Sequence, residues 1–464
     1  MLRRVLLALW TLALASVQAH AQLLPGRASG FRPGFQFIGG AGGFPASGAI
    51  VDYDFRGDRY SGPPISVSRA SPKYIDDSTG NWTLVPANAL ARSDKGTLIE
   101  GAQTNSIRNS SAQGTATGTP GTLANFWTFS LGSGISRTTV AYGTVNGLDC
   151  ADHRIFGSSA SSGAWLAANI QFEAAGAISA STGQLWTLSA FIQIVAGTTP
   201  GTVQLEMEEL TSSNSNVRYA NRNLTVDGTL RRYENSQTLS GGATTAAVRP
   251  GFWLYGPTVA NTPMDVTVRL CAPQMEQWST SITTAGGASS PIRTTGTAAT
   301  RAADVLTVDG LSLTDLTIAV VGQTAAGFNT QLGVYAEVND GSTANRIQFR
   351  YNSASNLLIA ITNRGGAQAT TFPQQNSPTA GALFAASTAI SLSTGQTAIA
   401  VNGASPPALA TTDRIPIGPL TRLSIGNSAG TSQPNAYLRR LVVWPYRAAN
   451  DNVSTYSTLS NWGG

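Results

Sequence analysis

The run Leu185-Trp-Thr-Leu-Ser-Ala-Phe-Ile-Gln-Ile-Val195 has an apolar residue at every second position. Alternate side chains of an extended strand point to the same face of a sheet. The residues on that face are Trp186, Leu188, Ala190, Ile192 and Ile194. The alternation therefore predicts a central strand of a β-sandwich.

Similar patterns lie on both sides of this run. Further strands are predicted at residues 203–210, 230–233, 251–255 and 264–270. No stretch between them sustains the 3.6-residue period of an amphipathic helix. Strands that follow one another without helices predict a two-sheet antiparallel sandwich of the jelly-roll type, here over residues 123–278.

The C-terminal segment, residues 302–464, has a second series of strand patterns. The predicted strands are residues 316–321, 333–338, 346–351, 357–362, 397–401, 422–425 and 437–443. Within 346–351 every second residue is polar, which predicts one buried and one solvated face. We expect a second sandwich there, with weak helical periodicity only at residues 450–459.

The N-terminal part divides into three pieces. Residues 1–21 contain Arg3 and Arg4, then a short apolar stretch and then small residues, which is the order of segments in a cleaved signal peptide. A buried N-terminal strand or helix is the alternative. Residues 22–49, rich in Gly and Pro, predict an extended arm that docks onto a partner. Residues 50–110 predict a small β module, followed by a Ser/Thr/Gly linker.

Charged residues make up only 11% of the 464 residues, against about 25% in ordinary soluble domains. The net charge is +5, but the only lysines are Lys73 and Lys95 and the arginines are scattered. No basic patch follows from such a pattern, so nucleic-acid binding is not expected.

The chain has two cysteines, Cys150 and Cys271. After export to an oxidising compartment, two cysteines of one module can form a disulfide. They can equally remain as two buried free thiols, and the sequence leaves both interpretations open.

No convincing catalytic site is visible. Glu206 and Glu208 share a strand face, as a glycosidase pair requires, but Glu209 points the opposite way, and we expect ordinary solvated carboxylates. His153 is the only histidine beyond His20 of the signal segment and is expected at the surface. A zinc site is excluded by the scarcity of His and Cys. The expected function is therefore non-enzymatic.

Calcium is the one cofactor that remains open. Carboxylates that can supply oxygen ligands are Asp304, Asp309, Asp340 and Asp413. None of them stands in a loop with regular ligand spacing. We therefore predict no metal site, with calcium as the alternative.

Glycan binding has the most suggestive residues, because sugar rings stack on exposed aromatic rings. In residues 251–256, Phe252 and Leu254 can face the core while Trp253 and Tyr255 take the other side. If that side is open, the pair forms a stacking platform; if it is covered, both rings belong to a core or a subunit interface. Weaker candidates are Trp127, Trp165, Tyr335 and Asn402.

Several short motifs occur in a recognisable order. They are Ser68-Arg-Ala-Ser71, Tyr74-Ile-Asp76, Gly96-Thr-Leu-Ile-Glu100, Thr104-Asn105, Gln274-Met-Glu276 and Ala299-Thr-Arg-Ala-Ala-Asp304. This order resembles phage head-spike and tail-fibre proteins over residues 50–304. Three later motifs resemble the concanavalin A-like (laminin G-type) lectin sandwich: Ala400-Val-Asn-Gly403, Leu423-Ser-Ile-Gly426 and Tyr437-Leu-Arg-Arg-Leu-Val-Val-Trp444.

The resemblance implies a homotrimeric virion protein that adheres to cell-surface polysaccharide and contacts other virion proteins through its arm. It carries over no binding residues, because the family's signature is structural. A secreted bacterial lectin is the alternative, since it explains the signal peptide directly. A polysaccharide-cleaving enzyme using Glu206 and Glu208 is the third interpretation.

Overall fold

In a computed structural model of the chain, the described residues are 47–463, except 164, 243, 279–286, 325–332, 353–356, 371–372, 377, 380, 407–409, 414 and 417. The expected signal peptide, and all of the expected arm before residue 47, lie outside this part. The described chain is nearly all β, as expected, with one α-helix and one 3-10 helix. None of its described helices has the length and hydropathy of a membrane span.

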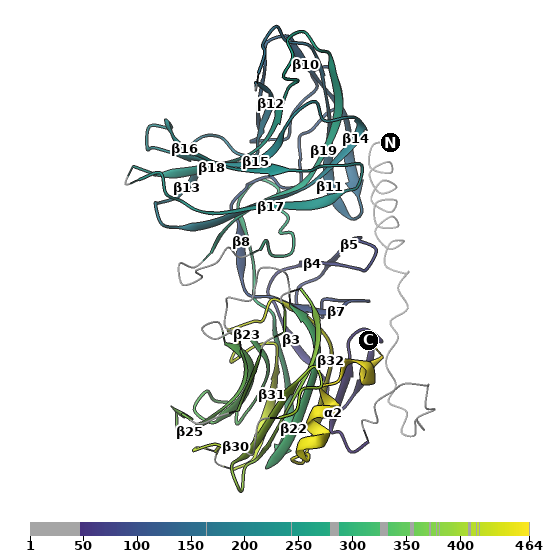
Figure 1. Cartoon of the computed structure of the whole chain (residues 1–464), viewed down its shortest axis with the longest axis vertical. Helices are drawn as coiled ribbons and strands as arrows, with labels where there is room; N and C mark the ends of the chain where they lie inside the picture. Colours follow the sequence, from purple (N-terminus) through teal and green to yellow (C-terminus); the bar gives the residue numbers. More distant parts are fainter. Residues whose placement is uncertain are drawn as a thin grey trace, which may run out of the picture. The chain divides into compact units, whose positions relative to one another are not determined.

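Residues 51–99 and 305–444 together build one β-sandwich, which we call the terminal sandwich (Figure 1). Its nine-stranded sheet consists of β1 (Val51–Asp54), β2 (Arg59–Ser61), β6 (Arg92–Ser93), β7 (Gly96–Ile99), β22 (Asp315–Thr324), β28 (Leu383–Ser391), β29 (Gln396–Val401), β30 (Ala410–Thr411) and β32 (Ala436–Trp444). Its eight-stranded sheet consists of β3 (Ser66–Ser68), β21 (Val305–Leu313), β23 (Gly333–Asn339), β24 (Arg346–Asn352), β25 (Leu357–Arg364), β26 (Ala367–Gln368), β27 (Gln374–Asn376) and β31 (Leu420–Ile425).

Residues 128–278 build a second sandwich, which we call the middle sandwich. Its five-stranded sheet consists of β10 (Ile135–Val145), β11 (Leu148–Gly157), β14 (Leu185–Gly197), β17 (Arg231–Thr238) and β19 (Met264–Trp278). Its six-stranded sheet consists of β9 (Thr128–Leu131), β12 (Leu166–Gln171), β13 (Ile178–Ser179), β15 (Val203–Leu210), β16 (Asn216–Leu224) and β18 (Ala247–Tyr255). Two small antiparallel pairs complete the strands: β4 (Lys73–Asp76) with β5 (Trp82–Val85), and β8 (Gln103–Asn105) with β20 (Ala299–Arg301).

The strands of residues 50–110 do not stand apart as the expected module. Strands β1 and β7 both pair with β32, and β3 pairs with β21. The side chains of Val51, Tyr53 and Ile99 lie in the same buried cluster as those of the C-terminal strands. Short strands need a larger sheet to bury their apolar face, and here that sheet comes from more than 200 residues further along the chain.

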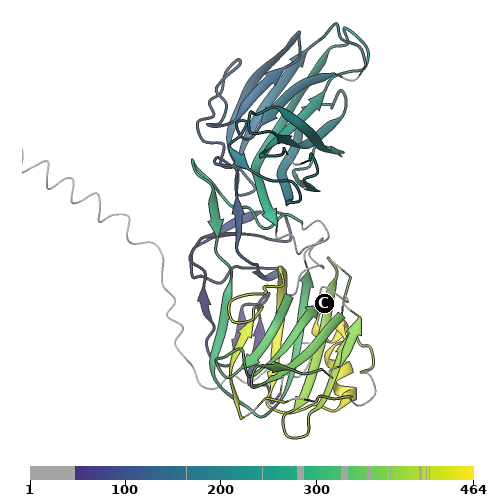
Figure 2. The same ribbon diagram turned by 90° about the vertical axis from the view of Figure 1, so that its left-hand side faces the viewer.

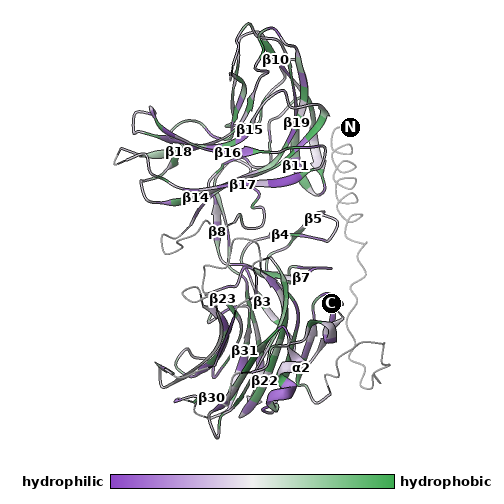
Figure 3. Ribbon diagram, viewed as in Figure 1, coloured by the Kyte–Doolittle hydropathy of each residue, from purple (hydrophilic) through white to green (hydrophobic). Residues whose placement is uncertain are grey.

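The run that predicted a sandwich is strand β14, between β19 and β17 of the five-stranded sheet. All five even-numbered side chains from Trp186 to Ile194 lie in the core of the middle sandwich. Facing them across that core are residues of the six-stranded sheet, among them Met207 and Phe252. Hydrophobic and hydrophilic residues both occur along the strands of each sandwich (Figure 3), as expected when one face of each sheet is buried.

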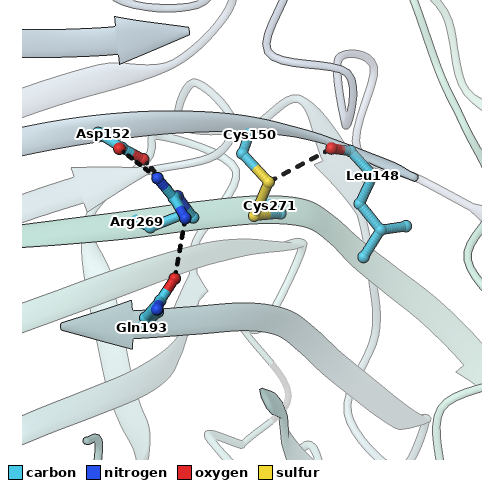
Figure 4. The surroundings of a disulfide bond; sticks show 6 residues. All are labelled: Leu148, Cys150, Asp152, Gln193, Arg269 and Cys271. Atoms are coloured by element: carbon cyan, nitrogen blue, oxygen red, sulfur yellow. Dashed lines mark hydrogen bonds and ion pairs between the residues drawn. A yellow bond between two sulfur atoms is a disulfide. The ribbon is translucent and has the colours of Figure 1, made fainter. Parts of the chain in front are cut away.

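Cys150 and Cys271 form a disulfide, with Cα atoms 4.1 Å apart. They lie directly opposite each other on β11 and β19, in register. Nearby, Arg269 donates to both carboxylate oxygens of Asp152 and to Gln193 (Figure 4). The disulfide therefore joins neighbouring strands within one sheet of the middle sandwich.

Helix α2 (Asn450–Tyr456) follows the last strand and packs on the nine-stranded sheet (Figure 2, yellow). Val453 is fully buried against alanines of β28 and β29. The 3-10 helix η1 (Leu459–Trp462) comes next. The weak helical pattern at residues 450–459 is thus confirmed in its first seven residues, where small alanine side chains let the helix approach the sheet.

Candidate functional site

The outer face of the six-stranded sheet, pointing away from the core, carries the strongest candidate site. Strand register brings its residues together: Glu206 of β15 lies opposite Gly251 of β18 on one side and Asn221 of β16 on the other. Gln171 of β12 lies opposite Gly251 from the far side, and Asn169 lies opposite Trp253. Residues directly opposite in a sheet share a face, so we call this set the Gly251 face.

Three aromatic rings lie on the Gly251 face. Tyr219 is 49% exposed, and its ring centroid is 5.3 Å from that of Trp253 in an edge-to-face arrangement. The ring of Tyr255 is 6.3 Å from that of Trp253. Phe252 and Leu254 point into the core, as expected. The predicted separation of these four residues by face is correct, but Trp253 itself is mostly covered and Tyr219 offers the open ring.

Polar atoms without partners lie beside these rings. Within the described residues nothing hydrogen-bonds Asn169 Oδ1, Gln171 Oε1, Trp253 Nε1 or either carboxyl oxygen of Glu206, although all are buried. A Cβ at Gly251 would lie 3.5 Å from Trp253 Nε1 and 3.6 Å from Asn169 Oδ1. The missing side chain of Gly251 thus leaves space bordered by unpaired polar atoms.

The two glutamates of this face have different surroundings. Burial and, to a smaller extent, the negative charge of Glu208 raise the pKa of Glu206 to about 9, although the positive charge of Arg249 partly opposes them. Glu206 is therefore a neutral acid at pH 7 that can donate as well as accept. Glu208 instead accepts from Arg249 Nε at 2.6 Å and from Asn216 Nδ2 at 3.1 Å.

Two expectations about polar residues are wrong. Glu206 and Glu208 are not solvated: they are 1% and 4% exposed, because neighbouring side chains cover their strand face. His153 is not at the surface but fully buried, with its ring near Arg137 and Thr139. Burial lowers the pKa of His153 to about 3, helped by Arg137, so it stays neutral. A single sequence cannot show that these polar residues lie under others.

The four weaker glycan candidates do not gather at the Gly251 face. Trp127 is buried and donates to the carbonyl of Asn109, and Trp165 donates to that of Pro257. Tyr335 is 1% exposed in the core of the terminal sandwich. Asn402 has a φ of 50° and accepts from the backbone of Ala385, which makes it a turn residue.

Two of the four aspartates considered for calcium are engaged in ion pairs. Asp304 is buried in ion pairs with Arg69 at 2.8 Å and Lys73 at 2.6 Å, while Asp309 pairs with Arg422. Among the described residues no group of three or more His, Cys, Asp or Glu side chains is placed to hold a metal. Calcium binding by Asp340 or Asp413 stays a prediction.

The sequence did not reveal four residues of the Gly251 face: Tyr219, Gly251, Asn169 and Gln171. Each is an ordinary strand residue on its own. Only the register of β16, β15, β18 and β12 brings them together. The one available signal was the alternation of apolar and polar residues along each strand. It predicts which residues of one strand share a face, but not which residues of other strands lie beside them.

No protein-family model matches the chain, and no curated protein matches it. Solved structures do show similarity. The CBM40 carbohydrate-binding module of Ruminococcus gnavus IT-sialidase, bound to α2,6-sialyllactose, is 11% identical and covers 32% of this chain and 84% of its own, with a TM-score of 0.26.

Two further structures have comparable scores. The tandem CBM22 domains of Paenibacillus barcinonensis Xyn10C are 11% identical, with 76% of this chain and 99% of theirs covered and a TM-score of 0.24. A heptameric SAP-like pentraxin of Limulus polyphemus is 14% identical, with 32% and 71% covered and a TM-score of 0.24. Identities and TM-scores this low do not indicate a shared ligand.

Proposed function

We propose that the protein binds a neutral glycan on the Gly251 face. The observation that carries this proposal is the cluster of unpaired buried polar atoms around Gly251, beside the exposed ring of Tyr219. A sugar presents a flat C–H face that can stack on such a ring and hydroxyls that both donate and accept. The chemistry of this face therefore matches a saccharide.

The polar atoms favour hydroxyl groups over charged ones. Asn169 Oδ1 and Gln171 Oε1 are acceptors and need donors from the ligand. Neutral Glu206 can accept or donate a hydrogen bond, and Trp253 Nε1 is free to donate one to a ligand. An unpaired buried polar group costs roughly 1–3 kcal/mol, so a hydroxyl that pairs several of them at once gains affinity.

The sharpest test is Gly251→Ala. The new methyl would meet its nearest atom, the carbonyl oxygen of Ile170, at 3.4 Å, which is ordinary van der Waals contact, so folding should be retained. The same methyl fills the space between Trp253 Nε1 and Asn169 Oδ1. We expect glycan affinity, measured by calorimetry with the best ligand from a glycan array, to fall roughly tenfold or more.

Tyr219→Ala removes the stacking ring and should weaken the same ligand roughly 3- to 10-fold. Tyr142→Ala is the matched control: Tyr142 is 41% exposed and lies on β10 of the other sheet. Its removal should leave affinity unchanged. Equal affinity of the wild type and Gly251→Ala, or no glycan bound by the intact chain, would remove the proposal.

We further propose that binding is not followed by cleavage. Glu206 has the raised pKa of a general acid, which is the one observation in favour of a glycosidase. The second carboxylate of such an enzyme must be free to act as nucleophile or base. Glu208 is engaged by Arg249 and Asn216 at its two oxygens, which supports a binding role. Turnover of a polysaccharide panel that disappears in both Glu206→Gln and Glu208→Gln would overturn this.

The biological setting we propose is a homotrimeric virion spike or fibre that adheres to host-surface polysaccharide and attaches to other virion proteins through residues 22–49. The ordered motifs of residues 68–105 and 274–304 support it. The alternative, a secreted bacterial lectin, is supported by the signal-like residues 1–21. Mass spectrometry of purified phage particles and of culture supernatants distinguishes the two, and a monomer in analytical ultracentrifugation would contradict the trimer.

A further inference from the structure

A second polar cluster lies on the outer face of the eight-stranded sheet, in the terminal sandwich. Strand β24 carries Arg346, Gln348 and Arg350 on the face turned away from the core, while Ile347 and Phe349 lie in the core. Glu337 of β23 lies opposite Gln348. It is fully buried and is the carboxylate at the centre of this cluster.

Both guanidinium groups converge on the middle of the cluster. Arg346 Nη1 donates to Ser428 Oγ at 2.7 Å and lies 3.3 Å from Glu337 Oε2. Arg350 Nη1 donates to Gln348 Oε1 at 3.1 Å. Gln348 Nε2 donates in turn to Ser428 Oγ at 2.9 Å and to Glu337 Oε2 at 2.8 Å. One amide thus connects the two arginines to one carboxylate.

The charges of this cluster do not balance. Glu337 already accepts hydrogen bonds from Arg346, Gln348 and Ser428. In the described part of the chain no carboxylate forms an ion pair with Arg350. Burial and the positive charge of Arg346 lower the pKa of Arg350 to about 10, although the negative charge of Glu337 partly opposes them. Two like charges held together on a partly exposed sheet face, with one carboxylate between them, favour a further anion.

Each arginine also keeps one edge without a protein acceptor. The hydrogen bonds to described residues use Nη1, and the buried Nε of both Arg346 and Arg350 has no partner among those residues. The Nε side of a guanidinium is one of the edges that bind the two oxygens of a carboxylate in parallel. Described residues therefore hold both guanidinium groups in place through Nη1 and leave the Nε of each without a hydrogen-bond partner.

We propose that the outer face of the eight-stranded sheet binds the carboxylate of an acidic saccharide between Arg346 and Arg350. The site is separate from the Gly251 face and does not depend on the proposed neutral-glycan function. Uronic acids and sialic acids both carry a carboxylate, so either class of sugar suits this site. The experiment below distinguishes the two classes.

The experiment titrates the full chain with three sugars of similar size: tri-galacturonic acid, sialyllactose and neutral galactotriose. Inorganic sulfate is the fourth probe. We expect one of the two acidic sugars to bind, galactotriose and sulfate to bind at least tenfold more weakly, and Arg350→Gln to weaken the acidic sugar roughly tenfold or more. Whichever acidic sugar binds identifies the source of the carboxylate.

Arg422→Gln is the matched control, because it removes the same charge from the same sheet but from an arginine already paired with Asp309 at 2.6 Å. Gly251→Ala is the second control and should leave acidic-sugar binding intact. Arg350→Lys keeps the charge without the fork and should also weaken binding, which covers the case that Arg350→Gln does not fold.

Three results would overturn the proposal. Arg350→Gln and Arg422→Gln could weaken binding equally, which indicates general charge attraction. Sulfate could bind as tightly as the acidic sugars, which indicates an unspecific anion site. Finally, neither acidic sugar could bind to the wild type at all.

Discussion

The two sandwiches use their outer faces differently and are also built differently. The middle sandwich is continuous in sequence and presents the exposed ring of Tyr219 beside the ring of Trp253. The terminal sandwich is assembled from two distant segments and presents Arg346 and Arg350 around Glu337. One fold class thus provides an aromatic face with unpaired polar atoms and a cationic face, and the residues on three or four neighbouring strands decide which.

The sandwiches are also held together by different means. Cys150 and Cys271 cross-link the middle sandwich. Buried ion pairs link Asp304, at the start of the C-terminal segment, to Arg69 and Lys73 of the N-terminal segment. A discontinuous sandwich needs contacts that fix its two segments to each other, and these ion pairs provide them.

Replacing both Cys150 and Cys271 by Ala should have the largest effect. The disulfide joins residues 121 apart in sequence, and closing a loop of that size contributes about 4–5 kcal/mol in the chain-entropy model. Unfolding in urea should show the middle sandwich destabilised by that order and the terminal sandwich unchanged. The wild type measured with a reductant should have the same stability as the variant. An equal loss of stability in both sandwiches would show that the disulfide does not act on the middle sandwich alone.

Asp304→Ala should destabilise the terminal sandwich by about 3–5 kcal/mol, because Arg69 and Lys73 would be left buried with one carboxylate fewer. Asp309→Ala is the control: its ion pair with Arg422 is exposed on both sides and should contribute at most about 1 kcal/mol. Equal midpoints for the two variants in denaturant would show that the buried ion pairs do not fix the segments.

Glu206→Gln should change the pH dependence of stability. The pKa of Glu206 rises from 4.5 to about 9 on folding, so the folded chain keeps a proton that the unfolded chain loses. The contribution of Glu206 to wild-type stability should therefore be fully present below pH 4.5 and be lost as the pH rises towards 9, whereas the variant lacks this loss. Melting curves of both proteins at pH 4, 7 and 9 should diverge progressively; parallel curves would show that Glu206 is not a buried acid.

Tyr219→Ala should have the smallest effect on stability, at most about 1 kcal/mol, because half of the ring is exposed and its main contact is one edge-to-face pair with Trp253. Its effect on glycan affinity should exceed its effect on the melting temperature. A large loss of stability would instead identify Tyr219 as a packing residue of the middle sandwich.

Local alternation of apolar and polar residues was enough to predict most of the strands and the face to which their side chains point. Residues 203–210 and 346–351 were expected as strands, and β15 and β24 contain them. The sheet face on which Trp253 and Tyr255 lie was also predicted correctly, because successive side chains of a strand point to opposite faces whatever its neighbouring strands are.

The pairing of the strands, and every feature that depends on more than one strand, became visible only in the folded chain. Periodicity says nothing about register, so it did not show that β1 and β7 complete the sheet of β32, that Glu206 lies opposite Gly251, or that His153 is covered. A binding face is made of residues from several strands that the strand register places side by side. Their composition is fixed by long-range pairing, which a local pattern of apolar and polar residues does not contain.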